Sequence, residues 1–222
     1  MNGKPEIVDR KTWLKARRAL LREEKALTRY RDYVVAKRQA LPWVKVEKNY
    51  TFTGPGGECS LADLFAGRSQ LVIYHFMYGP DWEQGCDGCT QVADSFANSV
   101  PYLEMSDVSL VAVSRTSLEK IDAYKRRMGW AFPWVSSLES DFNFDYYASY
   151  ADPELGEKVF NFQKVQAAMD ETHGHSVFVM DDGVIYHTYS SYARSVDALM
   201  MHLQYQDLTP NGRGEDSGAR RA

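Results

Sequence analysis

Residues 70–78, with the sequence QLVIYHFMY, are almost continuously apolar. They are rich in β-branched and aromatic residues, which favour strands, and they lack the polar alternation of a strand with one face in water. Gly79 and Pro80 then end the run. A strand of this composition has to be covered on both faces, so the chain must build a sheet that lies between two other layers.

The segments after this strand repeat in a regular order. Residues 87–100 are compatible with a helix, 107–114 form a second buried strand and 117–128 return to a helix, which predicts a parallel βαβ unit with a right-handed crossover. Residues 176–180 and 184–190 flank an Asp-Gly turn and predict a β-hairpin. A helix over 195–206 closes the core. The expected fold class is therefore α/β with a mixed central sheet.

A long basic helix is expected at the N-terminus. Apolar residues recur there every seven positions and predict one helix from about residue 12 to residue 40, ended before Pro42: Trp13, Leu20, Leu27, Val34 and Leu41. Residues 1–48 hold 14 Lys and Arg against 6 Asp and Glu, which gives +8, and because the whole chain carries −4 the remainder carries −12. The apolar stripe predicts docking within the chain or in a homodimer, and its interleaved cations favour neither nucleic acid nor a membrane as partner.

Length and composition describe an ordinary globular protein. The chain has 222 residues, of which 44% are hydrophobic and 25% are charged. No apolar run is long enough to span a bilayer, and the start lacks the apolar stretch of a secretory signal. Three cysteines are also too few for a disulfide scaffold. We therefore expect a cytoplasmic protein. We expect a helical extension over 1–48, one domain over 49–208 and a disordered tail over 209–222.

Cys86 and Cys89 are separated by two residues, where the first buried strand gives way to a helix. With Cys86 at the helix N-terminus, unpaired backbone N–H groups and the helix dipole would stabilise its thiolate. The thiolate is the form that attacks disulfides and peroxides, so Cys86 is the expected nucleophile and Cys89 the expected resolving thiol. Asp87 should oppose this by raising the pKa of Cys86.

Two other hypotheses stay open. A Cys-x-x-Cys pair is also half of a zinc site, and His173 and His175 would complete a Zn or Cu site with Cys86 and Cys89. The strand-to-helix context favours redox chemistry over metal binding. The third hypothesis is a non-catalytic scaffold that works through the N-terminal helix.

Two further residues near this motif carry weaker expectations. Trp82 would form an aromatic wall over the cysteine pair, or else fill the core as most aromatic residues do. Cys59 has no partner close in sequence and is expected to be an incidental small residue.

The order strand, Cys-x-x-Cys, helix, strand, helix, hairpin, helix, over about residues 60–206, resembles the thioredoxin superfamily. Three strings more narrowly resemble the bacterial thioredoxin-like family known as domain of unknown function 899: LPWVKVEKNYTF, SLADLFAGRSQLVIYHFMYGPDWEQGCDGC and DLTPNGRG. The resemblance covers nearly the whole chain. It implies a thioredoxin-like, or peroxiredoxin-like, three-layer sandwich and a dithiol-disulfide oxidoreductase activity of Cys86 and Cys89 that needs no cofactor.

The resemblance also implies which residues face the cysteine pair. Thioredoxins carry a cis-proline just before the hairpin strand, and this chain has His175 and Ser176 there. One of these two is therefore expected close to Cys86, where a histidine would lower the pKa of the thiol or bind a metal. The implied partners are a disulfide-bearing or peroxide substrate and a thiol reductant.

Overall fold

The computed structural model describes residues 5–150, 158–165 and 170–214. The chain divides into two compact units, Met1–Pro42 and Trp43–Ala222, and each is described by itself. The boundary lies after Pro42, whereas the sequence predicts a domain that begins at residue 49. No helix in the described part of the chain is both long and apolar enough to cross a bilayer.

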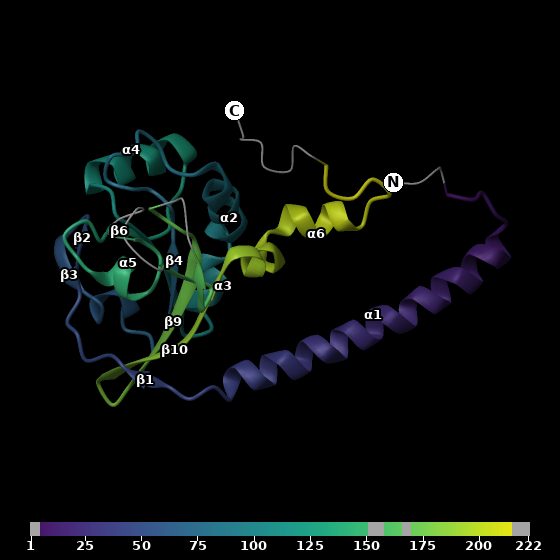
Figure 1. Cartoon of the computed structure of the whole chain (residues 1–222), viewed down its shortest axis with the longest axis horizontal. Helices are drawn as coiled ribbons and strands as arrows, with labels where there is room; N and C mark the ends of the chain where they lie inside the picture. Colours follow the sequence, from purple (N-terminus) through teal and green to yellow (C-terminus); the bar gives the residue numbers. More distant parts are fainter. Residues whose placement is uncertain (1–4, 151–157, 166–169, 215–222) are drawn as a thin grey trace. The chain divides into compact units, whose positions relative to one another are not determined.

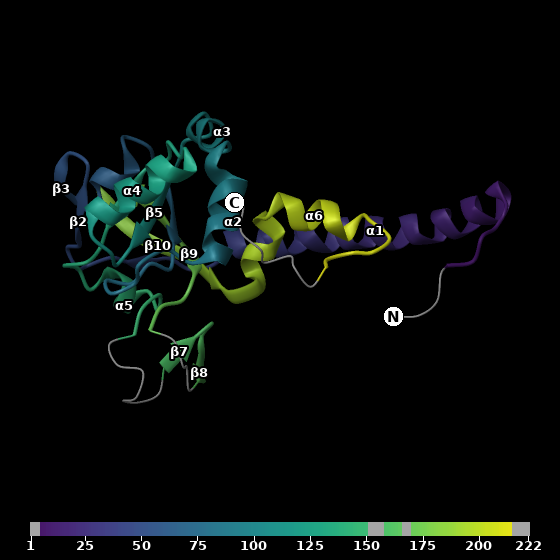
Figure 2. The same ribbon diagram turned by 90° about the horizontal axis from the view of Figure 1, so that it is seen from above.

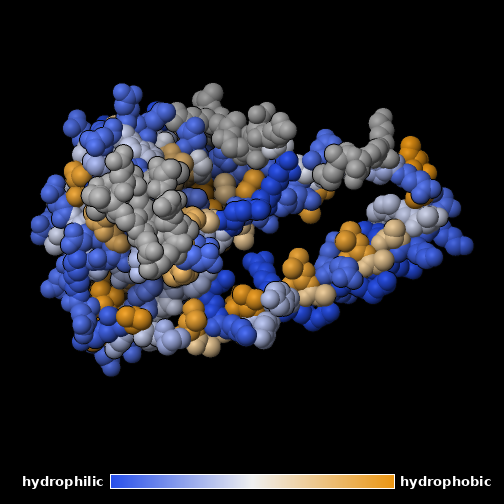
Figure 3. All heavy atoms as spheres, viewed as in Figure 1, coloured by the Kyte–Doolittle hydropathy of each residue, from blue (hydrophilic) through white to orange (hydrophobic). Residues whose placement is uncertain are grey.

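The first unit consists of one long helix, α1 (Arg10–Gln39). Asp9 caps it, since its carboxylate accepts the Thr12 N–H at 2.7 Å, and the helix ends three residues before Pro42, close to where the sequence predicts. None of its residues is buried within the structure. Apolar side chains such as Trp13, Leu20 and Leu27 are exposed among the basic ones. Figure 3 shows orange, hydrophobic patches among the blue surface of this helix.

The second unit is built on an eight-stranded mixed sheet (Figure 1). Its strand order is β1-β10-β9-β4-β5-β6-β2-β3. At the centre, β4 (Gln70–His75) runs parallel to β5 (Val108–Ser114) and antiparallel to β9 (Gly174–Asp181). The other strands are β1 (Val44–Lys45), β2 (Thr51–Gly54), β3 (Gly57–Ser60), β6 (Trp134–Ser136) and β10 (Val184–Tyr192). A parallel βαβ unit joined through β4 to an antiparallel hairpin is the thioredoxin-like topology, so the expected fold class is confirmed.

Two apolar clusters cover the two faces of the sheet. One cluster packs side chains of α2 (Asp87–Ala97), α4 (Leu118–Met128) and α6 (Met201–Asp207) against Tyr74 and Phe76. The other packs η1 (Asp63–Phe65) and α5 (Phe142–Asp145) against Leu71 and Ile73. Successive residues of β4 thus point into different clusters, because side chains alternate along a strand. A short helix, α3 (Val100–Glu104), follows α2 along the chain.

The sequence-based description of the C-terminal region differs from the structure in detail. The expected helix over 195–206 is two elements, η2 (Ala193–Leu199) and α6, which are separated at Met200 by a residue with extended backbone. The first part of the expected disordered tail is ordered, since Arg213 pairs with Asp197 at 2.8 Å and with Asp207 at 2.7 Å. Residues 215–222 lie outside the described part.

A small hairpin stands apart from the main sheet. It consists of β7 (Lys158–Phe160) and β8 (Gln163–Val165), which pair with each other only (Figure 2). It belongs to the stretch 141–168, for which the sequence predicts no definite architecture.

Candidate functional site

The chain between β4 and α2 places Cys86 at the tip of a helix. The Cys86 N–H donates to the Met77 carbonyl at 3.0 Å, and the Cys86 carbonyl accepts the Thr90 N–H at 3.0 Å as the first turn of α2 begins. Gly85 permits this path, because a Cβ at that position would lie 2.5 Å from Cε1 of Phe76. Cys86 is therefore the N-cap residue of α2, as the sequence predicts.

Cys86 is half-buried, and its surroundings favour the thiolate. A hydrogen bond from the Cys89 thiol is the main cause that lowers the pKa of Cys86 to about 6, and the backbone N–H groups of Cys89 and Gly88 add to it. Burial opposes this shift, and so does the negative charge of Asp87, in the direction the sequence predicts. The donors outweigh both, so Cys86 is mainly a thiolate at neutral pH.

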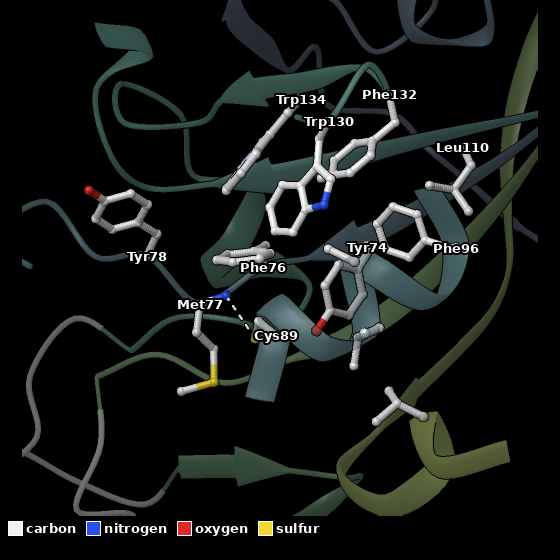
Figure 4. Close-up of a cluster of buried hydrophobic side chains, with 14 of the residues drawn as sticks. Tyr74, Phe76, Met77, Tyr78, Cys89, Phe96, Leu110, Trp130, Phe132 and Trp134 are labelled. Carbon is white, nitrogen blue, oxygen red and sulfur yellow. Dashed lines mark hydrogen bonds between the residues drawn. The ribbon is translucent and has the colours of Figure 1, made fainter. Parts of the chain in front are cut away.

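Cys89 has the opposite character. It lies on the inner side of α2 with 2% of its surface exposed, and its sulfur accepts the Met77 N–H at 3.4 Å (Figure 4). Burial raises the pKa of Cys89 well above its usual range, and the neighbouring Cys86 raises it further. The pair therefore combines an accessible thiolate with a buried thiol, and neither is in a disulfide.

Cys86 and Cys89 are among the residues that line a pocket of about 340 Å³, and we call it the thiol pocket. Its apolar side consists of residues from α2, from η2, from α6 and from the junction between η2 and α6: Val92, Val196, Leu203 and Met200. Its charged side consists of Arg194, Asp197 and Arg213, which pair with one another. A substrate that reaches Cys86 would thus meet apolar side chains and charges that are already paired.

Of the two histidines that the sequence singles out, His173 is the one that lines the thiol pocket. Its Nε2 lies 3.3 Å from the Ala193 carbonyl oxygen, and burial lowers its pKa. His175 lies deeper, with its ring centroid 5.0 Å from that of Tyr74. Burial lowers the pKa of His175 to about 4, so this side chain is neutral near pH 7.

Ser176 points to the other face of the sheet. Its hydroxyl lies 2.8 Å from Nε2 of His75 and 2.9 Å from the Ser190 hydroxyl, in a buried polar network. His75 stacks on Phe142, which belongs to the cluster on the face away from the cysteines. Of the two residues expected near Cys86, His175 or Ser176, the serine therefore faces away from the cysteine pair.

Trp82 is a half-buried part of the loop before Cys86 and is absent from the lining of the thiol pocket. It packs against the apolar cluster and against Gly79, where a Cβ would lie 2.9 Å from the indole ring. Its backbone carbonyl accepts a hydrogen bond from Lys120 at 2.9 Å. This geometry matches the core-filling alternative.

The structure does not assemble the alternative metal site. Among the described residues, no three His, Cys, Asp or Glu side chains are close enough together to hold a metal ion, and all four expected ligands are described: Cys86, Cys89, His173 and His175. The third cysteine has a structural role. The Cys59 thiol donates to the Phe52 carbonyl at 3.6 Å, and burial raises its pKa.

Three residues of the site carry no distinctive sequence signal. Lys120 donates to the carbonyls of Pro80 at 2.8 Å and Trp82 at 2.9 Å, and so holds the loop before Cys86. Tyr74 contacts the cysteine pair from β4, and Arg213 closes the thiol pocket from beyond α6. Each looks like an ordinary helix, strand or tail residue in the sequence.

Comparisons with known proteins give one family match over the chain. A model of the family described as "Bacterial protein of unknown function (DUF899)" matches residues 2–222. No curated protein matches.

Several solved structures are similar over about three quarters of this chain. A cysteine-to-serine mutant of peroxiredoxin Q from Xanthomonas campestris is 20% identical, with a TM-score of 0.45 and coverage of 75% of this chain and 97% of that one. A PrxQ mutant from Xylella fastidiosa is 16% identical, with a TM-score of 0.47 and coverage of 73% and 94%. Peroxidoxin BcpB from Mycobacterium tuberculosis is 15% identical, with a TM-score of 0.45 and coverage of 74% and 97%.

Proposed function

This chain belongs to the DUF899 family of bacterial proteins of unknown function, and from the chemistry of its own site we propose that it is a thiol-based oxidoreductase. In this proposal Cys86 attacks a disulfide or a peroxide and Cys89 resolves the product. A thiol reductant then restores the pair.

The observation that carries the proposal is the asymmetry of the two thiols. Cys86 caps α2, borders the thiol pocket and has a pKa of about 6, while Cys89 is buried and its pKa is raised. A thiol with a pKa near or below ambient pH is present as thiolate, which is the attacking form, and a partner one helical turn away can reach its sulfur afterwards. A purely structural pair would need neither the access nor the low pKa.

The reaction with a disulfide takes two steps. The Cys86 thiolate attacks one sulfur of R–S–S–R′, the bond between the two substrate sulfurs breaks, and R′S⁻ leaves and takes a proton from water. Cys89 then attacks the Cys86 sulfur of the mixed disulfide and RSH leaves, so that the protein ends with a Cys86–Cys89 disulfide. The pair is oxidised by two electrons and the substrate is reduced by two.

The reaction with a peroxide ends in the same state. The Cys86 thiolate attacks the terminal oxygen of ROOH, the O–O bond breaks, and RO⁻ leaves and takes a proton from water to become ROH, so the protein holds a Cys86 sulfenic acid. Cys89 condenses with it, which forms the disulfide and releases water. We propose that His173, rather than His175 or Ser176, faces the substrate, since it borders the thiol pocket and is neutral.

The first test is a redox titration of the full chain in glutathione buffers, read by mass spectrometry after thiol alkylation, with bound metal measured on the same sample. We expect one reversible two-electron transition of Cys86 and Cys89 without metal. Stoichiometric metal with both thiols protected from alkylation would contradict the proposal.

Substitutions then assign the roles. Cys86→Ser should abolish turnover of a disulfide or hydroperoxide in an assay coupled to a thiol reductant, while Cys89→Ser should permit one attack and stop multiple turnover. Cys59→Ser is the matched control and should leave turnover unchanged. Unimpaired multiple turnover of Cys89→Ser would refute the resolving role.

A further inference from the structure

We propose that the Tyr74 hydroxyl and the Met77 backbone N–H form a two-donor site that stabilises Cys89 as a thiolate in the resolving step. The inference rests on the proposed function and adds a catalytic residue to it. Tyr74 would act in the second step, in which Cys89 attacks. The first attack, by Cys86, would depend on the position of Cys86 at the N-terminus of α2.

The first support is an unusual feature of Tyr74. Its side chain is completely buried, and its hydroxyl makes no hydrogen bond with any of the described residues in the reduced protein. A buried hydroxyl without a partner costs free energy, so a native structure that keeps one requires an explanation. Phenylalanine would fill the same volume without that cost.

The second support is the place of this hydroxyl. In Figure 4 it points toward the first turn of α2, which carries Cys89. Burial is the main influence on the pKa of Cys89 and raises it, whereas the nearby Tyr74 hydroxyl and the Met77 N–H both lower it. The pKa of Tyr74 is itself raised well above its usual range by burial and by the two cysteines, so the hydroxyl stays protonated and acts as a donor.

The third support is a chemical requirement. In the reduced protein, Cys89 donates its proton in a hydrogen bond toward Cys86, and this bond lowers the pKa of Cys86. Once Cys86 is in a mixed disulfide it no longer carries a charge, and Cys89 has to become the nucleophile in a site with almost no water. Two fixed donors aimed at the sulfur would supply the stabilisation that water gives elsewhere.

The step balances as follows. Cys89 loses its proton as its sulfur bonds to the Cys86 sulfur, the Cys86–S–S–R bond breaks, and the departing thiolate takes up a proton to leave as RSH. Tyr74 keeps its own proton throughout. Its hydrogen bond to the Cys89 sulfur is strongest when that sulfur is negative and weakens once the protein disulfide has formed.

The test uses the full chain and a coloured probe, dithiobis(nitrobenzoate). Attack by Cys86 releases one coloured thiolate, and resolution by Cys89 releases the second, so stopped-flow absorbance separates the two steps. A Cys89→Ser variant identifies the second phase by its loss, and a Cys59→Ser variant identifies any signal from the third thiol.

We expect Tyr74→Phe to slow the second release about tenfold and to shift its pH midpoint upward, with the first release unchanged. Tyr50→Phe is the matched control, because the Tyr50 hydroxyl donates to Asp145 at 2.8 Å and belongs to the other cluster. Fluorinated tyrosine at position 74, a stronger donor of the same shape, should speed the second release, and it keeps the test valid if Tyr74→Phe does not fold.

The two proposals fail in different ways. If the wild-type protein shows two phases, and Tyr74→Phe leaves the second phase and its pH midpoint unchanged, the role of Tyr74 is refuted and the oxidoreductase proposal stands. If Cys86 releases no coloured thiolate from a folded, metal-free protein, the oxidoreductase proposal itself is refuted.

Discussion

Three residues apart in sequence, Cys86 and Cys89 differ in protonation because the first turn of α2 separates their surroundings. Cys86 stays at the helix tip, where N–H donors lower its pKa, and Cys89 turns inward to a place where burial raises its pKa. The hydrogen bond between them lowers one pKa and raises the other. The thiol groups and backbone N–H groups of this short motif therefore produce a nucleophile and a reserve thiol.

At the same scale, buried His75 should make the fold sensitive to acid. Burial is the main cause that lowers its pKa from 6.5 to about 3. As the pH falls below 6.5, His75 takes up a proton in the unfolded chain but stays neutral in the folded chain. The contribution of His75 to the free energy of unfolding is therefore complete above pH 6.5 and is lost as the pH falls toward 3. At pH 5 we expect a loss of about 2 kcal/mol from this residue relative to pH 7.

Urea unfolding of wild type and His75→Gln at several pH values measures this effect. The variant should have the flatter stability curve in mildly acidic solution, because glutamine does not titrate. Parallel curves for the two proteins would show that His75 does not carry the acid sensitivity. His175 shifts in the same direction in both proteins and cancels in the comparison.

Single residues also show where prediction from sequence stops. The Cys-x-x-Cys motif after a buried strand is sufficient to predict Cys86 at the helix tip, because that position follows from local chain geometry. Which of His173, His175 and Ser176 faces the thiol pocket depends on the register of β9. A strand turns successive side chains to opposite faces of the sheet, and Ser176 of β9 is on the face that carries His75. His173 comes just before β9 and borders the thiol pocket.

Among the elements, the loop between β4 and α2 decides where Cys86 lies, and α4 holds that loop. Lys120 of α4 donates to two loop carbonyls, and the Tyr78 hydroxyl donates to a third, that of Glu83, at 3.1 Å. A loop held at three carbonyls should keep Cys86 aligned at the helix tip without strain on the cysteine itself.

We therefore expect Lys120→Met to slow the first attack by Cys86 several-fold, because the loop loses two charge-assisted hydrogen bonds. The methionine keeps the apolar stem, so the melting temperature should change little. The loop amides should exchange hydrogen faster in this variant while the rest of the protein exchanges at its usual rate. A general loss of stability would instead speed exchange throughout the protein. Lys125→Met in the same helix is the control, and an equal slowing in both variants would contradict the role.

The elements with one simple pattern are those that the sequence predicts best. The strand β4, the pair β9 and β10 and the long α1 each have a clear apolar period or turn signal, and all are confirmed. The short α5 and the hairpin of β7 and β8 have no such period. The position of α5 depends on the packing of Phe142 in the second apolar cluster, which a local pattern does not reveal.

Over the whole molecule, charge is distributed unevenly between the N-terminal region and the rest. Residues 1–48 carry +8 and the remainder carries −12, and none of the side chains of α1 is buried. Opposite charges on two parts of one chain favour association between copies, in addition to the apolar stripe of α1. A homodimer through this helix remains a prediction.

Sedimentation analysis of the full chain and of residues 43–222 tests it. We expect a dimer for the full chain that weakens with added salt, and a monomer for the shortened chain. Leu27→Glu, on the apolar stripe, should also give a monomer, whereas exposed Leu208→Glu in the other unit should not. A full chain that sediments as a monomer at every salt concentration would contradict the prediction.

The ion pairs of Arg213 bear on how this protein should be trimmed for experiments. A chain cut at Leu208, where composition suggests that order ends, would lose the arginine that neutralises Asp197 and Asp207. It would leave two carboxylates near the thiol pocket without that partner and would remove part of the pocket wall. The charged side of the pocket would change from two arginines and one aspartate to one arginine and one aspartate. The shortened protein would then attract anionic substrates less strongly than the intact one, so its substrate preference would not represent that of the natural chain.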